Sequence, residues 1–318
     1  MSKTIVSLNR LSPEQEGLIR RSAPGYNLVQ TPAKTPDPAV LRSAEVVLGW
    51  SAAAAETLLE PDTPLRWVQT WSAGIDKLPL EQFQARGVLL TNASGVHAEP
   101  ISSVIFAYML NFTRDMHLSI RNQVQHRWHS ARGEGELHGK SIVICGTGAI
   151  GAETARIAKA FRMKTVGVSR SGRPLPDFDE MYRTPQLREA VAQGDFVVNT
   201  LPLTDETKHL FDEKMFAAFK PGACYINIGR GDTTDTEALM GALKSGHLRG
   251  AGLDVFETEP LPEDHPLWEM EQVIITPHNA GMTDVYTERV LDIFTGNLAS
   301  YVSEGAPRRN LVDYDRQY

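Results

Sequence analysis

The sequence predicts an α/β protein of two domains, each built on a parallel sheet. The 318 residues exceed the length over which a single hydrophobic core usually grows. Short apolar runs alternate with amphipathic stretches in two successive series, one before residue 98 and one after residue 139. The runs of the second series are the more apolar, which is typical of parallel strands that helices cover on both faces.

Apolar runs mark the candidate strands, five in the first series and six in the second. The first series predicts strands at Thr4–Leu8, Tyr26–Gln30, Val46–Gly49, Arg66–Thr70 and Val88–Thr91. The second series predicts strands at Ser141–Cys145, Lys164–Val168, Asp195–Asn199, Cys224–Ile228, Ala251–Val255 and Val273–Thr276.

Two long helices are predicted, one between the two series of strands and one after the second series. The first begins near Pro100, because proline suits a first helical turn, and its apolar residues have the i, i+3, i+4 spacing of one buried face. These residues are Ile101, Val104, Ile105, Tyr108, Met109 and Phe112. A last amphipathic helix, expected to pack on the first domain, carries Tyr286, Val290, Ile293, Phe294, Leu298 and Val302. Residues 98–282 would then form a dinucleotide-binding domain inserted into a substrate-binding domain made of 1–97 and 283–318.

Charge and composition narrow the classes of function. A formal net charge of -7 argues against a nucleic-acid-binding surface. No apolar run approaches the ~20 residues that span a bilayer, and the amino terminus lacks a signal-peptide core. Cys145 and Cys224 lie in β-rich apolar runs, where small buried thiols are expected rather than a disulfide or a metal site. We therefore expect a cytoplasmic protein without membrane, nucleic-acid or metal partners.

A glycine-rich turn follows the first strand of the second series. In IVICGTGAIG, Gly146, Gly148 and Gly151 lie between a predicted strand and a predicted helix. Gly146 would permit a tight turn, Gly148 the close approach of a pyrophosphate, and Gly151 close contact between helix and strand. The helix N-terminus would face the negative charge. The sequence therefore predicts a Rossmann-type dinucleotide site.

The end of the next strand indicates which dinucleotide is bound. An enzyme specific for NAD places a carboxylate there, against the ribose 2′-hydroxyl. This chain has Ser169, Arg170 and Ser171 instead. The planar guanidinium of Arg170 suits a 2′-phosphate, and the two serines can donate hydrogen bonds to it. We therefore predict that NADP(H) is favoured over NAD(H).

Three charged residues follow strands of the second series, where open α/β sheets place their ligands. They are Arg230 in NIGRGD, Glu259 in LDVFETEP and His278 in ITPHNAG. Reduction of a 2-keto acid needs a cation that holds the carboxylate and a proton donor for the developing alkoxide. Arginine suits the first task and histidine the second, with a neighbouring carboxylate to orient the imidazole.

The surrounding sequence resembles the D-isomer-specific 2-hydroxyacid dehydrogenase family. The matching stretches include SAGID (Ser72–Asp76), NTLPLTDETKHLF, FKPGACYINIGRGD, GAGLDVFETEPLPEDHPLW and VIITPHNAG, and they run through most of both series. Ser169 and Arg170 depart from the acidic pattern of many members and resemble the NADPH-preferring glyoxylate and hydroxypyruvate reductases. With this family the predicted fold is a Rossmann-type parallel-sheet cofactor domain inserted into a flavodoxin-like substrate domain.

The resemblance implies a role for each site residue. Arg230 would bind the substrate carboxylate and carbonyl, His278 would be the general acid/base, and Glu259 would pair with it. The backbone amides of Ala73 and Gly74 would hold the carboxylate. Asp254 would anchor the nicotinamide carboxamide, and Pro202 and Thr207 would lie against the cofactor. Further cofactor contacts are expected from Ala149, Ile150, Leu201, Ile228, Gly229, His278 and Gly281.

Three other residues carry weaker signals. Trp50 follows a strand of the first domain and is expected mainly to pack, with a substrate-pocket role as the alternative. His97 is expected to cap the long helix rather than to meet a substrate phosphate. Trp128 lies in a segment that resembles the family's dimer arm, so the resemblance implies a homodimer.

The sequence thus predicts an NAD(P)H-dependent reduction of a small 2-keto acid, of the glyoxylate or hydroxypyruvate type, to the D-2-hydroxy acid. Two alternatives stay open. One is D-3-phosphoglycerate dehydrogenase. The other belongs to a different class, a nucleotide-sensing binding protein like the corepressors that share this fold.

Overall fold

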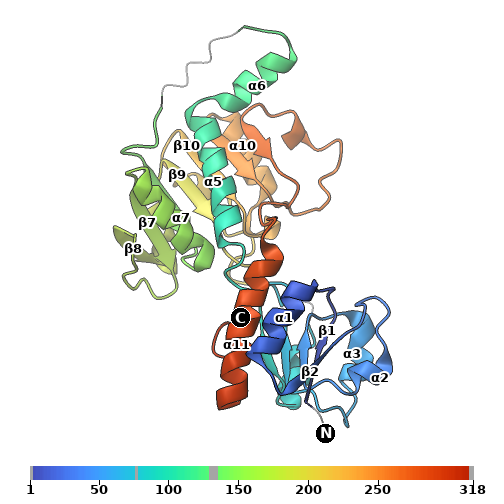
Figure 1. Cartoon of the computed structure of the whole chain (residues 1–318). Helices are drawn as coiled ribbons and strands as arrows, with labels where there is room; N and C mark the ends of the chain where they lie inside the picture. Colours follow the sequence, from blue (N-terminus) through green and yellow to red (C-terminus); the bar gives the residue numbers. More distant parts are fainter. Residues whose placement is uncertain (1–2, 76–77, 129–134, 315–318) are drawn as a thin grey trace. The chain divides into compact units, whose positions relative to one another are not determined.

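A computed structural model describes residues 3–75, 78–128 and 135–314 (Figure 1). Asp76, the last residue of the SAGID stretch, lies outside the described residues. The chain divides into two compact units. Unit 1 comprises residues 1–96 and 284–318, and unit 2 comprises residues 97–283.

Unit 1 is built on a five-stranded parallel sheet in the order β2-β1-β3-β4-β5. This is the flavodoxin-like order that the sequence led us to expect. The strands are β1 (Lys3–Ser7), β2 (Tyr26–Gln30), β3 (Val46–Leu48), β4 (Trp67–Gln69) and β5 (Leu89–Thr91). The helices are α1 (Pro13–Ser22), α2 (Pro38–Leu41), α3 (Ala52–Leu58), α4 (Leu80–Ala85) and α11 (Tyr286–Glu304).

The last helix, α11, packs on unit 1 beside α1 (Figure 1). Its buried residues Phe294 and Tyr301 lie against the ring of Trp67, with centroid distances of 5.3 and 5.2 Å. The prediction that Val302 belongs to the buried face is wrong, because its side chain is 47% exposed. Tyr301 takes that place, since the helix turns 100° per residue and carries Val302 toward solvent.

Unit 2 is built on a seven-stranded parallel sheet in the order β12-β11-β10-β9-β6-β7-β8. This is the Rossmann order extended by one strand, and the strand order reverses between β6 and β9. The strands are β6 (Ser141–Cys145), β7 (Lys164–Ser169), β8 (Glu180–Arg183), β9 (Phe196–Asn199), β10 (Ala223–Asn227), β11 (Leu248–Leu253) and β12 (Val273–Ile275). The helices are α5 (Ala98–Thr113), α6 (Met116–Val124), α7 (Ala149–Ala160), α8 (Leu187–Val191), α9 (Glu213–Phe216) and α10 (Thr236–Lys244), with short 3-10 turns at Thr184–Gln186, Gly231–Thr233 and Pro266–Trp268.

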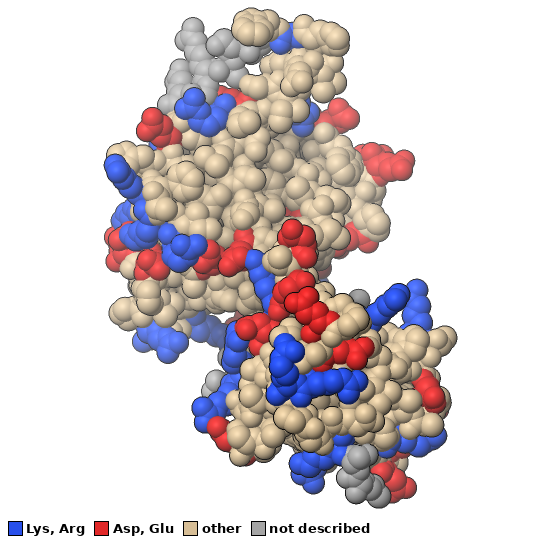
Figure 2. Space-filling view, viewed as in Figure 1, with Lys and Arg blue, Asp and Glu red and all other residues tan. Residues whose placement is uncertain are grey.

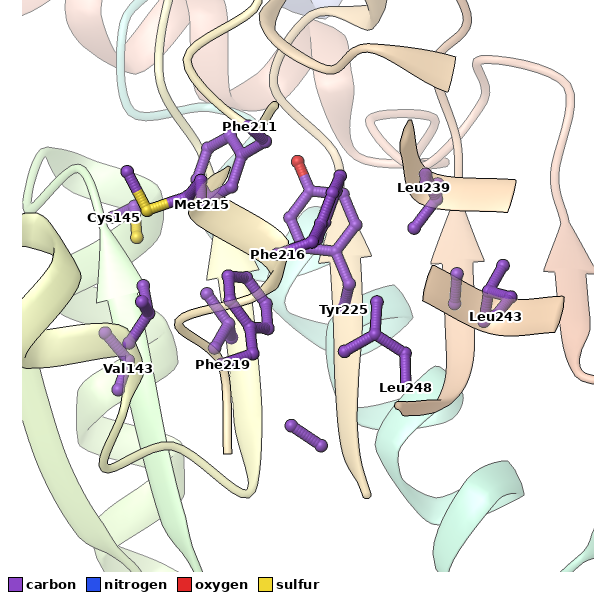
Figure 3. Packing of buried hydrophobic residues seen from close by; sticks show 14 of the residues in the cluster. Val143, Cys145, Phe211, Met215, Phe216, Phe219, Tyr225, Leu239, Leu243 and Leu248 are labelled. Atoms are coloured by element: carbon purple, nitrogen blue, oxygen red, sulfur yellow. The ribbon is translucent and has the colours of Figure 1, made fainter. Parts of the chain in front are cut away.

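Helices cover both faces of this sheet, because its strands are apolar on both sides. On β6, Ile142 and Ile144 face the side that α5 and α7 cover. Val143 and Cys145 face the other side, where residues of α8, α9 and α10 pack. Figure 3 shows the aromatic part of that second core, in which the Tyr225 ring lies among phenylalanines.

Both cysteines are buried free thiols, as their place in apolar strands predicted. Burial raises the pKa of Cys145 and of Cys224 to about 12, because the apolar surroundings disfavour the thiolate. No helix among the described residues is long and apolar enough to cross a bilayer.

All eleven predicted strands are present, most of them shifted by no more than one or two residues. One strand, β8, was not predicted. It is one of the two edge strands of its sheet, and none of its four residues is buried. An edge strand with partly exposed residues lacks the apolar run by which the other strands were found.

Candidate active site

The glycine-rich turn joins β6 to α7. Gly146 has φ +99°, which favours glycine. A Cβ at Gly151 would lie 2.1 Å from the carbonyl oxygen of Gly146, so only glycine allows the helix to approach the turn. A Cβ at Gly148 would meet no atom within 4 Å, and no side chain caps the helix that begins here. The helix N-terminus therefore presents its backbone amides to open space. Ala149 and Ile150, two of the predicted cofactor contacts, are the first residues of this helix.

Ser169 ends β7, and Ser169, Arg170 and Ser171 lead into a turn at Gly172, which has φ +61°. The Ser169 hydroxyl accepts a hydrogen bond from the Gly172 amide at 3.1 Å. The Ser171 hydroxyl accepts one from the Arg173 amide at 3.4 Å. Both hydroxyls keep their own hydrogens, so each can still donate to a ligand.

The loop after β9 carries Leu201, Pro202 and Thr207. The Thr207 hydroxyl donates to the Pro202 carbonyl at 2.7 Å and accepts from the Thr204 amide at 2.8 Å, which closes the loop on itself. The Leu201 amide donates to the side chain of Asn199. These contacts fix the loop at the carboxyl end of β9, next to the glycine turn, because the Thr200 hydroxyl also donates to the Gly146 carbonyl.

The loop after β10 carries Ile228, Gly229 and Arg230. A buried polar network supports it, in which the Arg230 carbonyl accepts from Asn227 Nδ2 at 3.1 Å and from the Thr233 hydroxyl at 2.6 Å. Asn199 Nδ2 donates to the Thr233 hydroxyl at 2.7 Å and so ties this loop to β9. The Arg230 side chain is exposed and donates to the Gly229 carbonyl through Nη1, which leaves its other donors for a ligand.

Glu259 and His278 form a hydrogen-bonded pair. His278 Nδ1 lies 2.7 Å from Glu259 Oε2, and Glu259 Oε1 accepts from the Phe256 amide at 3.0 Å. An ionised carboxylate only accepts, so Nδ1 carries the proton of this hydrogen bond and Nε2 takes no part in the pair. His278 has φ +51°, an uncommon conformation for a residue with a side chain.

The Arg230 loop and the Glu259 segment are in direct contact. A Cβ at Gly231 would lie 1.9 Å from the carbonyl carbon of Phe256, so the two backbones touch. The structure thus brings Arg230, Glu259 and His278 to the same edge of the seven-stranded sheet. Among the described residues, no group of three or more His, Cys, Asp or Glu side chains could hold a metal ion.

Asp254 is the buried centre of the loop that carries His278. Its Oδ1 accepts from the Thr276 hydroxyl at 2.5 Å and from the Asn279 amide at 3.0 Å. Its Oδ2 accepts from the Ala280 amide at 3.1 Å. The loop therefore folds around one carboxylate, a structural role that the sequence analysis did not foresee.

Tyr108 of α5 extends this chain of hydrogen bonds. Its hydroxyl lies 2.5 Å from the Thr276 hydroxyl. Burial raises the pKa of Tyr108 well above its ordinary value, so the phenol stays protonated and donates to Thr276. The ring lies on β11, because a Cβ at Gly252 would come within 2.6 Å of it. The spacing of α5 placed Tyr108 in the core, and a buried tyrosine hydroxyl needs a partner, but the partner could not be read from the sequence.

His97 occupies the predicted cap position at the start of α5, and it also contacts this loop. Its side chain makes no cap hydrogen bond. His97 Nδ1 lies 3.0 Å from the Gly281 carbonyl instead, because the loop passes directly over the start of the helix. A Cβ at Gly281 would lie 2.8 Å from that nitrogen.

A pocket of about 960 Å³ lies in unit 1 at the carboxyl ends of β1, β3 and β4. Trp50, Trp71 and Tyr286 line it, and Trp50 also packs edge-on against Phe83 at 4.9 Å. Trp50 therefore packs, as predicted, and also lines this pocket, while its contact with a substrate stays a prediction. Ser72 lines the pocket too, and its hydroxyl donates to the Gly74 carbonyl. The amides of Ala73 and Gly74 belong to this loop of unit 1.

Unit 2 has the architecture of a dehydrogenase that binds a dinucleotide. The family model described as "D-isomer specific 2-hydroxyacid dehydrogenase, NAD binding domain" matches residues 106–280. The chain belongs to the D-isomer-specific 2-hydroxyacid dehydrogenase family. It is an oxidoreductase of 2-hydroxy acids that uses a nicotinamide cofactor.

Named relatives resemble the chain over most of its length. It is 34% identical over 281 residues to glyoxylate/hydroxypyruvate reductase B of Citrobacter koseri, covering 84% of this chain and 86% of the relative. A phosphoglycerate dehydrogenase structure from Lactobacillus plantarum is 38% identical, with a TM-score of 0.59, covering 98% of this chain and 100% of that one. An NADPH-dependent glyoxylate/hydroxypyruvate reductase from Sinorhizobium meliloti, solved with NADP and sulfate, is 27% identical, with a TM-score of 0.79 and coverage of 99% and 100%.

Replacing Thr276 tests the hydrogen-bond chain from Tyr108 to Asp254. Thr276→Val removes the hydroxyl and leaves the Tyr108 phenol and a buried carboxylate oxygen each short of a partner. We expect it to lower the free energy of unfolding by about 1–3 kcal/mol. Thr276→Ser keeps the hydroxyl and is expected to cost less than about 1 kcal/mol. Urea unfolding followed by circular dichroism measures both, and equal losses would show that the hydroxyl contributes nothing.

Proposed function

We propose that the protein reduces a small 2-keto acid, of the glyoxylate or hydroxypyruvate type, to the D-2-hydroxy acid with NADPH. The observation that carries the proposal is the imidazole–carboxylate pair, in which His278 Nδ1 lies 2.7 Å from Glu259 on the same sheet edge as Arg230. In this proposal unit 2 binds the dinucleotide and unit 1 contributes the substrate pocket.

The side chains divide the work as follows. Arg230 holds the substrate carboxylate and polarises the ketone. When bound, the nicotinamide supplies the hydride that adds to C2. His278 gives the proton from Nε2 to the substrate oxygen and becomes neutral, so the keto acid gains one hydride and one proton. Glu259 orients the ring through its hydrogen bond to Nδ1.

The residues present fit a dinucleotide. The uncapped N-terminus of α7, with open space at Gly148, suits a pyrophosphate. Pro202, Thr207 and Gly229 lie on loops at the same sheet edge, with Leu201, Ile228 and Gly281 beside them. Asp254 Oδ2 accepts one hydrogen bond and keeps the capacity to accept another from the carboxamide.

The NADP preference rests on the turn after β7. Residues 169–173 contain no Asp or Glu, so no carboxylate of this turn would repel a 2′-phosphate. The arginine at 170 supplies a cation there, and the hydroxyls of Ser169 and Ser171 retain their donors. The S. meliloti relative, solved with NADP, supports the same preference.

The pocket of unit 1 favours a substrate with an uncharged tail. Its described lining has three aromatic rings and several hydroxyl and amide groups, but no Lys or Arg. A phosphorylated substrate needs a cation for its phosphate. The L. plantarum relative keeps phosphoglycerate dehydrogenase as the second candidate.

The substrate class is tested by measuring oxidation of NADPH and NADH with a panel of keto acids. We expect turnover with glyoxylate and hydroxypyruvate, a higher kcat/KM with NADPH than with NADH, and little activity with 3-phosphohydroxypyruvate. Preference for 3-phosphohydroxypyruvate would favour the alternative function, D-3-phosphoglycerate dehydrogenase. Tight NADPH binding without turnover of any keto acid would favour the nucleotide-sensing class.

The role of His278 is tested by His278→Asn. We expect kcat to fall by about 10²–10⁴-fold with a small change in KM, because a proton donor acts in the transition state. The matched control is His209→Gln, since His209 Nε2 pairs with Glu257 at the same 2.7 Å only two residues from Glu259. The control is expected to retain kcat. A wild-type kcat in His278→Asn would refute the role.

We also propose a homodimer that α6 helps to form. Met116, Ile120 and Val124 follow one another at i, i+4 spacing and are 49%, 54% and 76% exposed, so α6 presents an apolar stripe to its surroundings. Trp128, just beyond, is fully exposed. A second copy of this chain is the partner that the family resemblance implies.

Sedimentation equilibrium tests the dimer. We expect a mass about twice the 35.1 kDa of the chain, and a shift toward monomer in Ile120→Glu, because a buried unpaired charge opposes association. Leu18→Glu, which places the same charge on an exposed apolar residue of α1, should leave the mass unchanged. A wild-type protein that sediments at the chain mass at micromolar concentration contradicts the proposal.

A further inference from the structure

We propose that Arg183 is a second guanidinium for the 2′-phosphate of the cofactor and shares this recognition with Arg170. The inference rests on the proposed use of NADPH. It concerns a residue on β8, the strand that the sequence did not predict, so Arg183 was not among the expected site residues.

The register of the sheet places Arg183 beside Ser169. The strands β7 and β8 run parallel, and Ser169 is the partner of Arg183 at the last position of both. Two residues earlier, Gly167 is the partner of Met181, and a Cβ at Gly167 would meet the Met181 sulfur at 2.5 Å. Side chains two apart on a strand share a face. Ser169 and Arg183 therefore project from the same face at the carboxyl edge.

The stem of Arg183 lies against the turn that carries Ser169, Arg170 and Ser171. A Cβ at Gly172 would come within 2.7 Å of Arg183 Cγ. Gly172 has φ +61°, and its amide donates to the Ser169 hydroxyl. The turn and the aliphatic stem are thus packed together, and the guanidinium belongs to the same corner of the sheet as Arg170.

Two carboxylates close to Arg183 in the sequence lie at the start of β8, the opposite end from Arg183, and each forms an ion pair with a lysine. Asp179 pairs with Lys159 at 2.5 Å, and Glu180 pairs with Lys164 at 2.7 Å. These lysines hold the pKa of both carboxyls below their ordinary values, so both carboxylates are ionised near neutral pH. No ion pair joins Arg183 to a carboxylate of residues 3–75, 78–128 or 135–314.

The carboxyl edge of β7 and β8 is therefore rich in arginine, with Arg170, Arg173 and Arg183 within a short stretch of surface. On the face seen in Figure 2, Lys and Arg side chains gather around these two strands, with Asp and Glu side chains among them. A phosphate dianion takes hydrogen bonds from more than one guanidinium, because its three terminal oxygens each accept.

A simpler role for Arg183 makes a different prediction. Charged side chains on an edge strand prevent pairing with another sheet. If this were the only role of Arg183, its removal would leave the binding of small nucleotides unchanged. The two roles are therefore separated by a binding measurement that does not depend on catalysis.

The experiment compares adenosine 2′,5′-bisphosphate with adenosine 5′-phosphate, which differ only in the 2′-phosphate, by titration calorimetry. For Arg183→Met we expect the Kd of the bisphosphate to rise about 10-fold and that of the monophosphate to stay within about twofold. Arg170→Met should act in the same direction. Lys244→Met removes an exposed charge at the end of α10, at the opposite edge of the sheet, and should change neither Kd.

Each result decides between the proposals. If Arg170→Met abolishes the discrimination while Arg183→Met leaves it intact, Arg183 has no part in recognition, but the NADP preference stands. If the wild-type protein binds both nucleotides equally, the NADP preference itself fails. If Arg183→Met weakens the binding of both nucleotides alike, without a change in the thermal midpoint of unfolding, its effect is not on the 2′-phosphate. The inference is then overturned.

Discussion

The candidate site depends on one buried anion, the carboxylate of Asp254. Four polar contacts from a hydroxyl and two backbone amides converge on it, and they fix the loop from Thr276 to Ala280. His278 projects from that loop in a backbone conformation that a free chain rarely adopts. The surrounding contacts thus hold a strained residue in place, as is common where a side chain must be aimed at a ligand.

Buried polar side chains also hold the Arg230 loop, but these side chains carry no charge. There the buried side chains are neutral amides and hydroxyls, with Asn199 and Asn227 at the ends of adjacent strands. Every one of these polar groups has a partner, which a buried polar network requires to be stable. The ring of Tyr225 packs among the aromatic rings seen in Figure 3, and its hydroxyl forms hydrogen bonds within the network. Arg230 and His278 are therefore exposed side chains on loops that buried hydrogen bonds hold in place.

Much of this arrangement was predictable because it is local. Apolar runs located the strands, and the spacing of Gly146, Gly148 and Gly151 located the turn before α7. What could not be predicted depends on contacts between distant residues. The segment ETE offers two glutamates. The family resemblance predicted the pair of Glu259 with His278, but only the fold shows that Glu257 pairs with His209. Likewise, Tyr108 meets Thr276 across 168 positions of the chain.

The insertion of unit 2 has a consequence for synthesis on the ribosome. The strands of unit 1 emerge first, but the helix that covers Trp67 and Ile5 starts only at residue 286. Unit 2 is continuous from 97 to 283 and is complete before that helix appears. The nascent chain therefore carries an apolar sheet that lacks one of its covering helices while a whole second domain is translated. At ordinary elongation rates of about 5–20 residues per second, this interval lasts roughly 10–40 s. During this time the exposed apolar surface of unit 1 is available to chaperones.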